Sequence, residues 1–315
     1  MALNPTPIAT TGATHTSQQF RMMVKDLARD NQGVTTGLDL KVSALATPGA
    51  GVQISDGSAV IAGRVTSTQG YYSAYNIGSD TVSIAATGST ARSDMLVLRV
   101  EDPDFEGTRD PATEPIVFWE VIPNVSSTAT TAPAGYSAVP LARIDIPANT
   151  ATITSAMIVD LRKIANPRTQ RDPYTYFASG TSILSGTSET WQDFPTGAQW
   201  TIAVPAWAAK VKIIFTLSGL ALDTGNVFGS LTFNFGGKEA AQWISIDDNQ
   251  GTAWRRQTYI MADTLSLTDT LGSTLRGTNV ILKSRMRTRA ANQGRMIVDG
   301  ATTFIADVAF EEGAI

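Results

Sequence analysis

The segment VKIIFTL, residues 211–217, decides the fold of the second half of this chain. Its apolar residues occupy every other position, and side chains at that spacing share one face of a β-strand. The same alternation recurs at residues 231–235, 280–286 and 304–310. Gly236–Gly237, directly after the first of these, is typical of a two-residue hairpin turn. Short alternating segments of this kind predict an antiparallel, jelly-roll-like β-sandwich over residues 172–315.

A single amphipathic helix is predicted near the N-terminus, after an extended leader over residues 1–19. The apolar residues at helical spacing are Phe20, Met23, Val24 and Leu27. We expect Ser17 to be the N-cap and residues 31–33 to end the helix. The leader is rich in Thr, Ala and Pro, a composition typical of extended or poorly ordered chain.

The rest of the first half, residues 20–168, is predicted to be a β-rich domain, which makes the whole chain mainly β. Residues 38–42 and 57–65 alternate as strands do, and residues 95–100 and 116–122 are apolar runs suited to buried strands. A stretch with two prolines and few apolar residues, ANPRTQRDPYT at 165–175, marks the domain boundary. A chain of 315 residues is long enough for two domains with separate cores.

Composition excludes several classes of function. A net charge of −4 provides no overall attraction for nucleic acid or an acidic membrane surface, and the absence of cysteine excludes disulfides, thiol catalysis and thiolate metal sites. No apolar run reaches the roughly 18 residues that span a bilayer, and the N-terminus lacks the features of a signal peptide. Charged residues make up 17% of the chain, below an average of about 25%, and small polar residues replace them. Such a composition is common in extracellular or particle-borne proteins, and release by lysis as part of a particle is one way for a protein without an export signal to leave the cell.

Catalysis is not expected, and no cofactor or metal is expected either. The only histidine is His15, which removes histidine-based triads and histidine-ligated zinc. Carboxylates remain as candidates for glycoside hydrolysis or Ca²⁺ binding. These are Glu101, Asp102, Asp104 and Glu106 in one loop, and Asp247 and Asp248 in the other domain. Because Asp, Pro and Gly are ordinary turn residues, solvated turn acids are the favoured interpretation.

A row of basic residues is the sharper pattern in the second half. Its members, at a spacing of two, are Lys283, Arg285, Arg287 and Arg289. On a strand they share one face, where guanidinium groups can bind phosphate or carboxylate groups of a wall polymer. The alternatives are a solvated strand face, or pairing with acids such as Glu311 and Glu312.

Aromatic residues offer a second kind of surface contact, because exposed rings stack on the faces of sugars. The second half contains Trp191, Trp200, Trp207, Trp243, Trp254 and Tyr259. Burial in the core or at a subunit interface is the favoured interpretation for most of them. Trp254, beside Arg255 and Arg256, is the preferred candidate for a contact with a ligand.

The order and spacing of four segments carry a family resemblance. These are GSAVIAG at 57–63, Arg92-x-Asp94, PLARIDIP at 140–147, and Ile158-x-Asp160-x-Arg162. Together they resemble the N-terminal domain of siphophage baseplate and minor tail proteins, over about residues 20–165. The segment LRGTNVILKSRMR, residues 275–287, is similar to the penultimate strand region in C-terminal domains of actinobacteriophage minor tail proteins.

The resemblance implies a first domain that docks to the phage tail and a second domain that recognises the host surface, usually as a homotrimer. Several weak sugar contacts engaged at once would then give firm attachment. A further hypothesis is that Arg92, Asp94, Asp160 and Arg162 form one charge-paired network that fixes strand register.

We therefore expect a structural virion protein of the distal tail, in the tail tip or baseplate, that functions in host attachment as a receptor-binding protein. It is made in the cytoplasm of the bacterial host. Its expected partners are further copies of itself, other tail-tip proteins, and a host cell-wall glycan or polyanion, with neither nucleic acid binding nor membrane insertion. One alternative is a trimeric collar or connector between tail components. A carboxylate-based glycan depolymerase is less favoured, because the long repetitive β-helix region usual in such enzymes is not visible.

Overall fold

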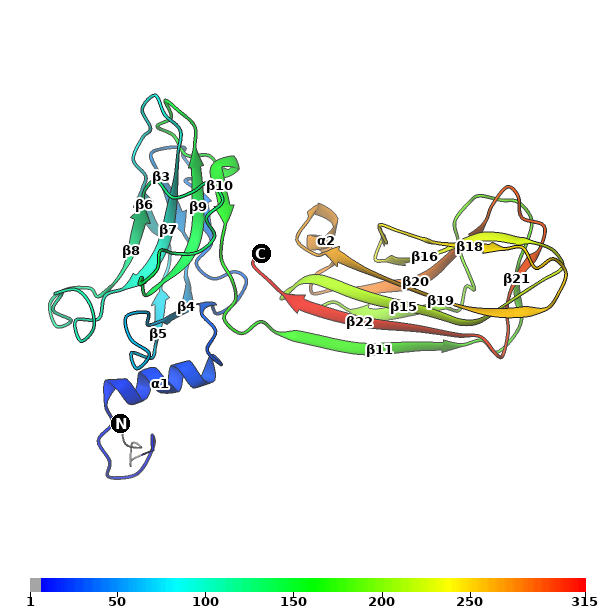
Figure 1. Ribbon diagram of the computed structural model, residues 1–315, viewed down its shortest axis with the longest axis horizontal. Coiled ribbons are helices and arrows are strands. Elements are labelled where there is room, and N and C mark those ends of the chain that lie inside the picture. Colours follow the sequence, from blue (N-terminus) through cyan, green and yellow to red (C-terminus); the bar gives the residue numbers. More distant parts are fainter. Residues whose placement is uncertain (1–6) are drawn as a thin grey trace. The chain divides into compact units, whose positions relative to one another are not determined.

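The chain divides into two units, each with its own core, in a computed structural model that describes residues 7–315 (Figure 1). The first unit runs to Pro167 and also includes Ala314–Ile315, and the second is Arg168–Gly313. The predicted mainly β, antiparallel fold is confirmed. Among the described residues, no helix is long and apolar enough to cross a membrane. Residues 1–6 of the expected leader lie outside the described residues.

The first unit is built from three antiparallel sheets. One contains β1 (Gly33–Val34), β4 (Gly57–Ala62) and β5 (Tyr71–Asn76), and another contains β2 (Val42–Ala44), β3 (Gly51–Ile54) and β6 (Asp80–Ser83). The third has the order β10 (Ile158–Asp160), β9 (Ala138–Ile146), β7 (Arg92–Val100) and β8 (Val117–Ile122). A short 3₁₀ helix, η1 (Ser155–Met157), precedes β10.

Strand β7 separates the two hydrophobic clusters of the first unit. Its alternating side chains are buried on both faces, because other chain segments cover each side of the sheet. Leu96 and Leu98 pack into the main core with residues from all three sheets. Met95 and Val97 face a smaller cluster that includes Leu161.

The N-terminal helix, α1 (Ser17–Leu27), begins one residue earlier than predicted, with Thr16 rather than Ser17 as its N-cap. Thr16 Oγ accepts a hydrogen bond from the Gln19 backbone N–H at 3.3 Å, and Gln19 Oε1 accepts from the Thr16 N–H at 2.8 Å. This capping box needs Gln three residues after the cap, a partner that Ser17 does not have. The last three residues of the expected leader are therefore helical. Half of the predicted apolar stripe is exposed, with Phe20 at 47% and Leu27 at 71%, and Val24 packs inward.

One strand prediction in the first unit is wrong, and another strand is less buried than predicted. Residues 37–40 form a turn, because the Asp39 carboxylate accepts hydrogen bonds from the backbone and hydroxyl of Thr36, at 3.0 and 2.8 Å. Leu40 there has a positive φ of 52°. The apolar run at 116–122 forms β8, which is only half-buried because it pairs with β7 alone at the edge of its sheet.

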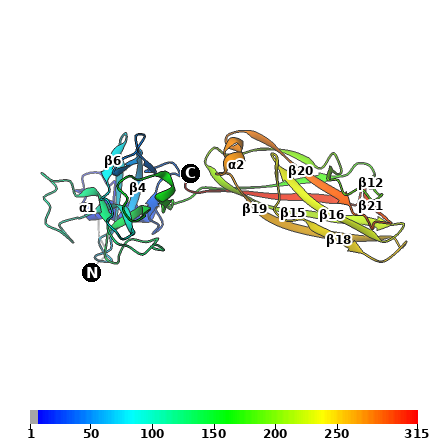
Figure 2. The same ribbon diagram turned by 90° about the horizontal axis from the view of Figure 1, so that it is seen from above.

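The second unit is the predicted antiparallel β-sandwich (Figure 1; Figure 2). Its first sheet has the order β11 (Thr169–Phe177), β22 (Thr303–Glu312), β15 (Ala208–Asp223), β21 (Arg295–Val298) and β12 (Ser182–Leu184), with β19 (Arg255–Ser266) paired to β15. Its second sheet contains β13 (Gln192–Asp193), β14 (Gln199–Ala203), β20 (Asn279–Thr288), β16 (Val227–Phe235), β17 (Lys238–Glu239) and β18 (Ile244–Asp248).

Alternating apolar side chains from both sheets fill the space between them, as predicted. Phe215 of β15 lies at the centre, with its ring centroid 6.0 Å from that of Phe233 and 6.1 Å from that of Phe304. All three rings are fully buried. The predicted hairpin at Gly236–Gly237 is confirmed, since both glycines have positive φ and they join β16 directly to β17.

Several features of the second unit were not predicted, among them the long strand β19. A short helix, α2 (Thr270–Leu275), is capped by Asp269, whose carboxylate accepts the Gly272 N–H at 2.7 Å. Its sequence, TLGSTL, has too few apolar residues to show helical spacing. Strand β11 contains Pro173, which is tolerated because β11 is an edge strand paired only with β22.

Replacing the central ring tests the core. We expect Phe215→Ala to lower the free energy of unfolding of the second unit by about 3–5 kcal/mol, because it leaves a cavity between the sheets. Ile183→Ala on β12 is the control, since Ile183 is 49% exposed, and it should change that energy by less than about 0.5 kcal/mol. Urea unfolding followed by tryptophan fluorescence reports this unit, because Trp119 is the one tryptophan outside it. An equal loss of unfolding free energy in the two variants would contradict the placement of Phe215 at the centre of the core.

An ion pair between β15 and β21 makes stability depend on pH. Arg295 donates two hydrogen bonds to Asp223, at 2.8 and 2.6 Å, and holds the pKa of that carboxyl below its ordinary value. The contribution is therefore complete at neutral pH and is lost as pH falls below about 4, through the folded-state pKa. We expect the urea midpoint of Asp223→Asn to fall less between pH 7 and pH 3 than that of the unmodified chain. An identical fall in both proteins would show that the pair contributes nothing.

Candidate functional site

The outer face of the β16–β20 sheet carries the predicted row of basic side chains. Leu282 and Met286 of β20 are fully buried between the sheets. Since side chains alternate along a strand, Lys283, Arg285 and Arg287 project from the opposite face. Arg289 follows the last residue of β20. The shared face predicted from the spacing is thus present.

Neighbouring strands place polar residues beside this row. The register pairs Lys283 with Asn234, Arg285 with Thr232, and Arg287 with Ser230 on β16. On the other side of β20, Asp193 of β13 lies opposite Arg285. Glu239 of β17 lies opposite Asn234 on the far side of β16.

Most of the row is neutralised by carboxylates. Lys283 Nζ lies 2.7 Å from Asp193 Oδ2. Arg285 Nε lies 3.4 Å from Asp193 Oδ1, and a second nitrogen of Arg285 pairs with Glu239. Arg289 pairs with Asp247. Pairing with acids was one of the alternatives, but different acids supply it, since Glu311 and Glu312 contact Lys210 and Arg168 on the first sheet.

Arg287 differs from its neighbours, because no carboxylate among residues 7–315 pairs with it. Its guanidinium carbon lies 4.6 Å from the ring centroid of Trp191 and 5.3 Å from that of Trp243. The two rings meet edge to face, with centroids 6.4 Å apart. Trp243 is 53% exposed. A cation held against two indole rings is stabilised by their quadrupoles. We call this group the Trp191–Arg287–Trp243 cluster.

A groove of about 630 Å³ adjoins the cluster, a volume typical of small-molecule sites. Its lining residues are Trp191, Gln192, Asp193, Asn234, Gly236, Gly237, Ile281, Lys283 and Arg285. The lining combines an aromatic ring with carboxylate, amide and cationic groups, so hydrogen-bond donors and acceptors lie side by side. Such a surface suits a ligand with several hydroxyl groups and an apolar face.

The predicted contact residues around Trp254 do not line this groove. Arg255 is buried in an ion pair with Asp248. Arg256 Nη2 lies 2.6 Å from Asp299, and its guanidinium carbon is 5.4 Å from the Trp254 ring centroid. Trp254 itself is 56% exposed.

Core burial is the right interpretation for some of the aromatic residues. Trp200, Trp207 and Tyr259 pack against the core, and burial raises the pKa of Tyr259 to about 12. Trp191 and Trp243 were counted among the aromatic residues but not placed with the basic row. Trp191 and Trp243 come close to the row because the strands that follow them, β13 and β18, join the sheet that contains β20.

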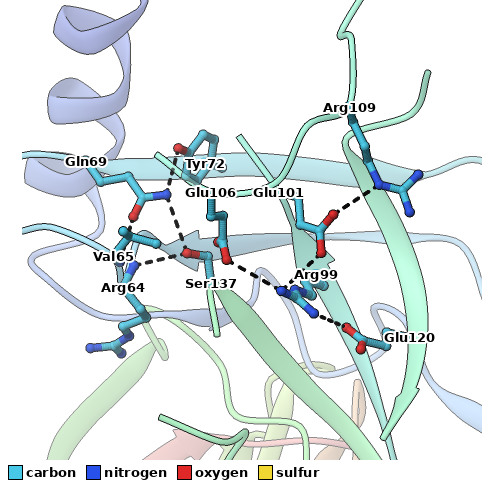
Figure 3. A network of polar contacts seen from close by, with 10 residues as sticks. All are labelled: Arg64, Val65, Gln69, Tyr72, Arg99, Glu101, Glu106, Arg109, Glu120 and Ser137. Atoms are coloured by element: carbon cyan, nitrogen blue, oxygen red, sulfur yellow. Dashed lines mark hydrogen bonds and ion pairs between the residues drawn. The ribbon is translucent and has the colours of Figure 1, made fainter. Parts of the chain in front are cut away.

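The acids of the 101–106 loop are mostly bound to arginines, so their interpretation as solvated turn acids is wrong. Figure 3 shows Arg99 among two of these carboxylates and Glu120 of β8, at 3.1 Å from Glu101, 3.5 Å from Glu106 and 2.8 Å from Glu120. Asp104 is the exposed member of the loop. In the described part of the chain, no group of three His, Asp or Glu side chains is arranged to hold a metal ion.

Asp102, the remaining acid of this loop, is buried beside Tyr72 and Arg21. It accepts a hydrogen bond from the Tyr72 hydroxyl at 2.7 Å and lies 3.3 Å from Arg21 Nη1. Burial and this hydrogen bond raise the pKa of Tyr72 well above its ordinary value.

The four residues of the hypothesised charge network form two separate local pairs. Arg92 contacts Asp94 at 2.9 Å, and Arg162 contacts Asp160 at 2.7 Å. Each pair joins residues two apart on the chain, so neither one bridges two strands. The fully buried Arg162 guanidinium also donates to the carbonyl oxygens of Gly37 and Asp39, at 3.1 and 2.8 Å, and so holds the turn before β2.

Comparison with known proteins found only distant similarities. No protein-family model matches the chain, and no curated protein matches it. The structure of infectious bursal disease virus Gx strain is 11% identical, with 89% of this chain and 80% of that chain covered and a TM-score of 0.25. The VP2 subviral particle of infectious bursal disease virus is also 11% identical, with 94% and 86% covered and a TM-score of 0.26. Similarities at this level do not establish a common function.

Removing the three acids beside the row tests whether they neutralise it. We expect the combined variant Asp193→Asn, Glu239→Gln and Asp247→Asn to bind heparin–agarose at a salt concentration where the unmodified chain flows through, because released cations attract sulfates. The matched control removes three acids from the first sheet, as Asp172→Asn, Asp307→Asn and Glu311→Gln. If both variants elute together, net charge explains the result and the neutralised row does not.

Proposed function

We propose that the protein is a structural, non-enzymatic component of a phage virion, located in the distal tail. Its first unit attaches to other tail proteins, and the outer face of the β16–β20 sheet in its second unit binds a saccharide of the host surface. The single observation that carries the binding role is the Trp191–Arg287–Trp243 cluster beside a polar groove.

Sugar recognition requires an apolar surface for the ring face and paired donors and acceptors for the hydroxyl groups. The half-exposed ring of Trp243 supplies a surface of the first kind. Asp193, Asn234 and Lys283 in the groove supply acceptors and donors. Ion pairing holds two of these groups in place before a ligand arrives, which lowers the ordering cost of binding.

The charge of the face favours a neutral or zwitterionic saccharide over a polyanion. Lys283, Arg285 and Arg289 already have carboxylate partners, and Arg287 is occupied by indole rings. A strongly anionic polymer would have to displace these partners or approach the carboxylates that face it. The ligand class proposed for this site is therefore a wall saccharide with few charges.

Attachment through the first unit rests on the resemblance of residues 20–165 to siphophage tail-docking domains. We also propose that the protein is a homotrimer. The sheet of the second unit that contains β15, β19 and β22 exposes apolar side chains on its outer face, which subunit contacts would bury. Ile260, Thr216 and Ile305 form a row across β19, β15 and β22, and Phe177 is exposed on β11. Contact with further copies of the chain would cover this face and add the binding strength of several sites.

A collar or connector is the second candidate, and the same exposed apolar row favours it. The depolymerase alternative has less support. Asp193 and Glu239 both adjoin the groove, but both are engaged in ion pairs with Arg285. A glycosidase needs one carboxylic acid able to give up a proton to the leaving group.

Binding to cells tests the proposal. We expect the fluorescently labelled full chain to bind permissive actinobacterial cells saturably, and to lose this binding when wall glycans are removed. Trp243→Ala should bind about tenfold more weakly, because it removes the exposed stacking surface. Trp254→Ala is the control, since that ring is as exposed but does not belong to the Trp191–Arg287–Trp243 cluster beside the groove, and it should bind as the unmodified chain does.

A folded, oligomeric protein that binds no permissive host would leave the collar as the better explanation. Equal losses in the two tryptophan variants would remove the groove from the proposal. Release of reducing sugars from purified wall glycan would overturn the non-enzymatic assignment.

A further inference from the structure

A second cavity, of about 330 Å³, lies within the first unit and shares no residue with the proposed saccharide site. The loop at residues 130–136 forms one wall, and the first residues of β9 form another. Leu161 and Lys163, which follow β10 in the chain, also line the cavity, as does Arg64, which follows β4. Its volume is at the small end of the range for ligand sites, enough for a few side chains.

The charge around this cavity is positive and uncompensated. Arg64 and Lys163 are exposed, and neither makes an ion pair with any residue in 7–315. No acidic residue lines the cavity. In Figure 3 the backbone N–H of Arg64 donates to Ser137 Oγ, at 3.1 Å, while its guanidinium extends away from the polar network. Most Lys and Arg side chains of this chain pair with a carboxylate, so two unpaired cations at one cavity are unusual.

Part of the wall between these cations is apolar. Ala138 and Leu161 are buried members of the smaller hydrophobic cluster beneath β7. Tyr136 packs against the same cluster, and the Arg99 guanidinium lies 4.1 Å from the centroid of its ring. The loop is tied down by Arg143, which donates to the Ala129 carbonyl at 3.0 Å. One wall of the cavity thus belongs to a hydrophobic cluster, and the loop beside it is anchored at its start.

We propose that this cavity binds an acidic segment of a partner protein. A carboxylate of the segment lies between Arg64 and Lys163, and an adjacent apolar side chain enters the space lined by Tyr136, Ala138 and Leu161. Charge complementarity identifies the carboxylate, and the apolar floor identifies its neighbour. The inference rests on the proposed attachment role of the first unit and names the site and the chemistry of that attachment.

Two peptides that differ in one residue test this site. The probes are fluorescein-labelled Ala-Leu-Asp-Leu-Ala amide and the same peptide with Asn in place of Asp, and the measurement is fluorescence anisotropy with the full chain. We expect saturable binding of the Asp peptide, about threefold or more tighter than that of the Asn peptide at low salt, with the difference shrinking as salt increases.

Three variants locate the binding. Arg64→Gln and Lys163→Gln should each abolish the preference for Asp, whereas Lys41→Gln, an exposed lysine of the same unit that borders no part of the cavity, should preserve it. The same variants are assayed for binding to glycan-bearing cells, which should not change. Binding of neither peptide, equal binding of both, or an Asp preference that survives both cavity variants would overturn the cavity assignment. Saccharide binding that persists through such a failure leaves the proposed host-binding role intact.

Discussion

The burial of alternate side chains between the two sheets of the second unit is the constraint on which the rest of that unit depends. Phe215, Phe233 and Phe304 meet at its centre and fix which face of each strand points inward. A slip of one residue in any strand would exchange its two faces. Because Leu282 and Met286 must be inside, the basic residues between them must be outside. The geometry of the candidate site is therefore set by apolar packing on the opposite side of the same strand.

Most charged side chains described above form ion pairs with other residues of the chain. Arg99 joins three glutamates at the base of β7 and β8, and Arg162 is buried at the turn before β2. On the outer face of the second unit the row of cations is likewise balanced by nearby carboxylates. Basic sequence patterns alone would have indicated a polyanion site. The structure shows a nearly neutral face whose most distinctive feature is a cation between two indole rings.

Local spacing in the sequence predicted the strands β15, β16, β20 and β22, the hairpin at Gly236–Gly237 and the shared face of the basic row, because each follows from a period of two or from one turn. It could not predict the partners of that row. Asp193 lies opposite Arg285 through a pairing that joins residues far apart in the chain, and Trp243 arrives from a different loop. The short polar helix α2 forms because Asp269 caps it, and its sequence has no helical spacing to reveal it. The predicted start of α1 was wrong by one residue because the side chain of Thr16, and not that of Ser17, makes the capping hydrogen bond.

The aromatic residues of the proposed binding face lie outside the regular strands. Trp191 immediately precedes β13 and Trp243 immediately precedes β18, whereas the arginine between them belongs to β20 in the middle of the sheet. Loop positions accept substitutions more readily than the strands they connect. Evolution can therefore change the shape and chemistry of this surface one loop at a time while the sandwich beneath it keeps its sequence. The proposed binding face and the folded core are thus separable under mutation, a property suited to a protein whose target diversifies faster than its own core can.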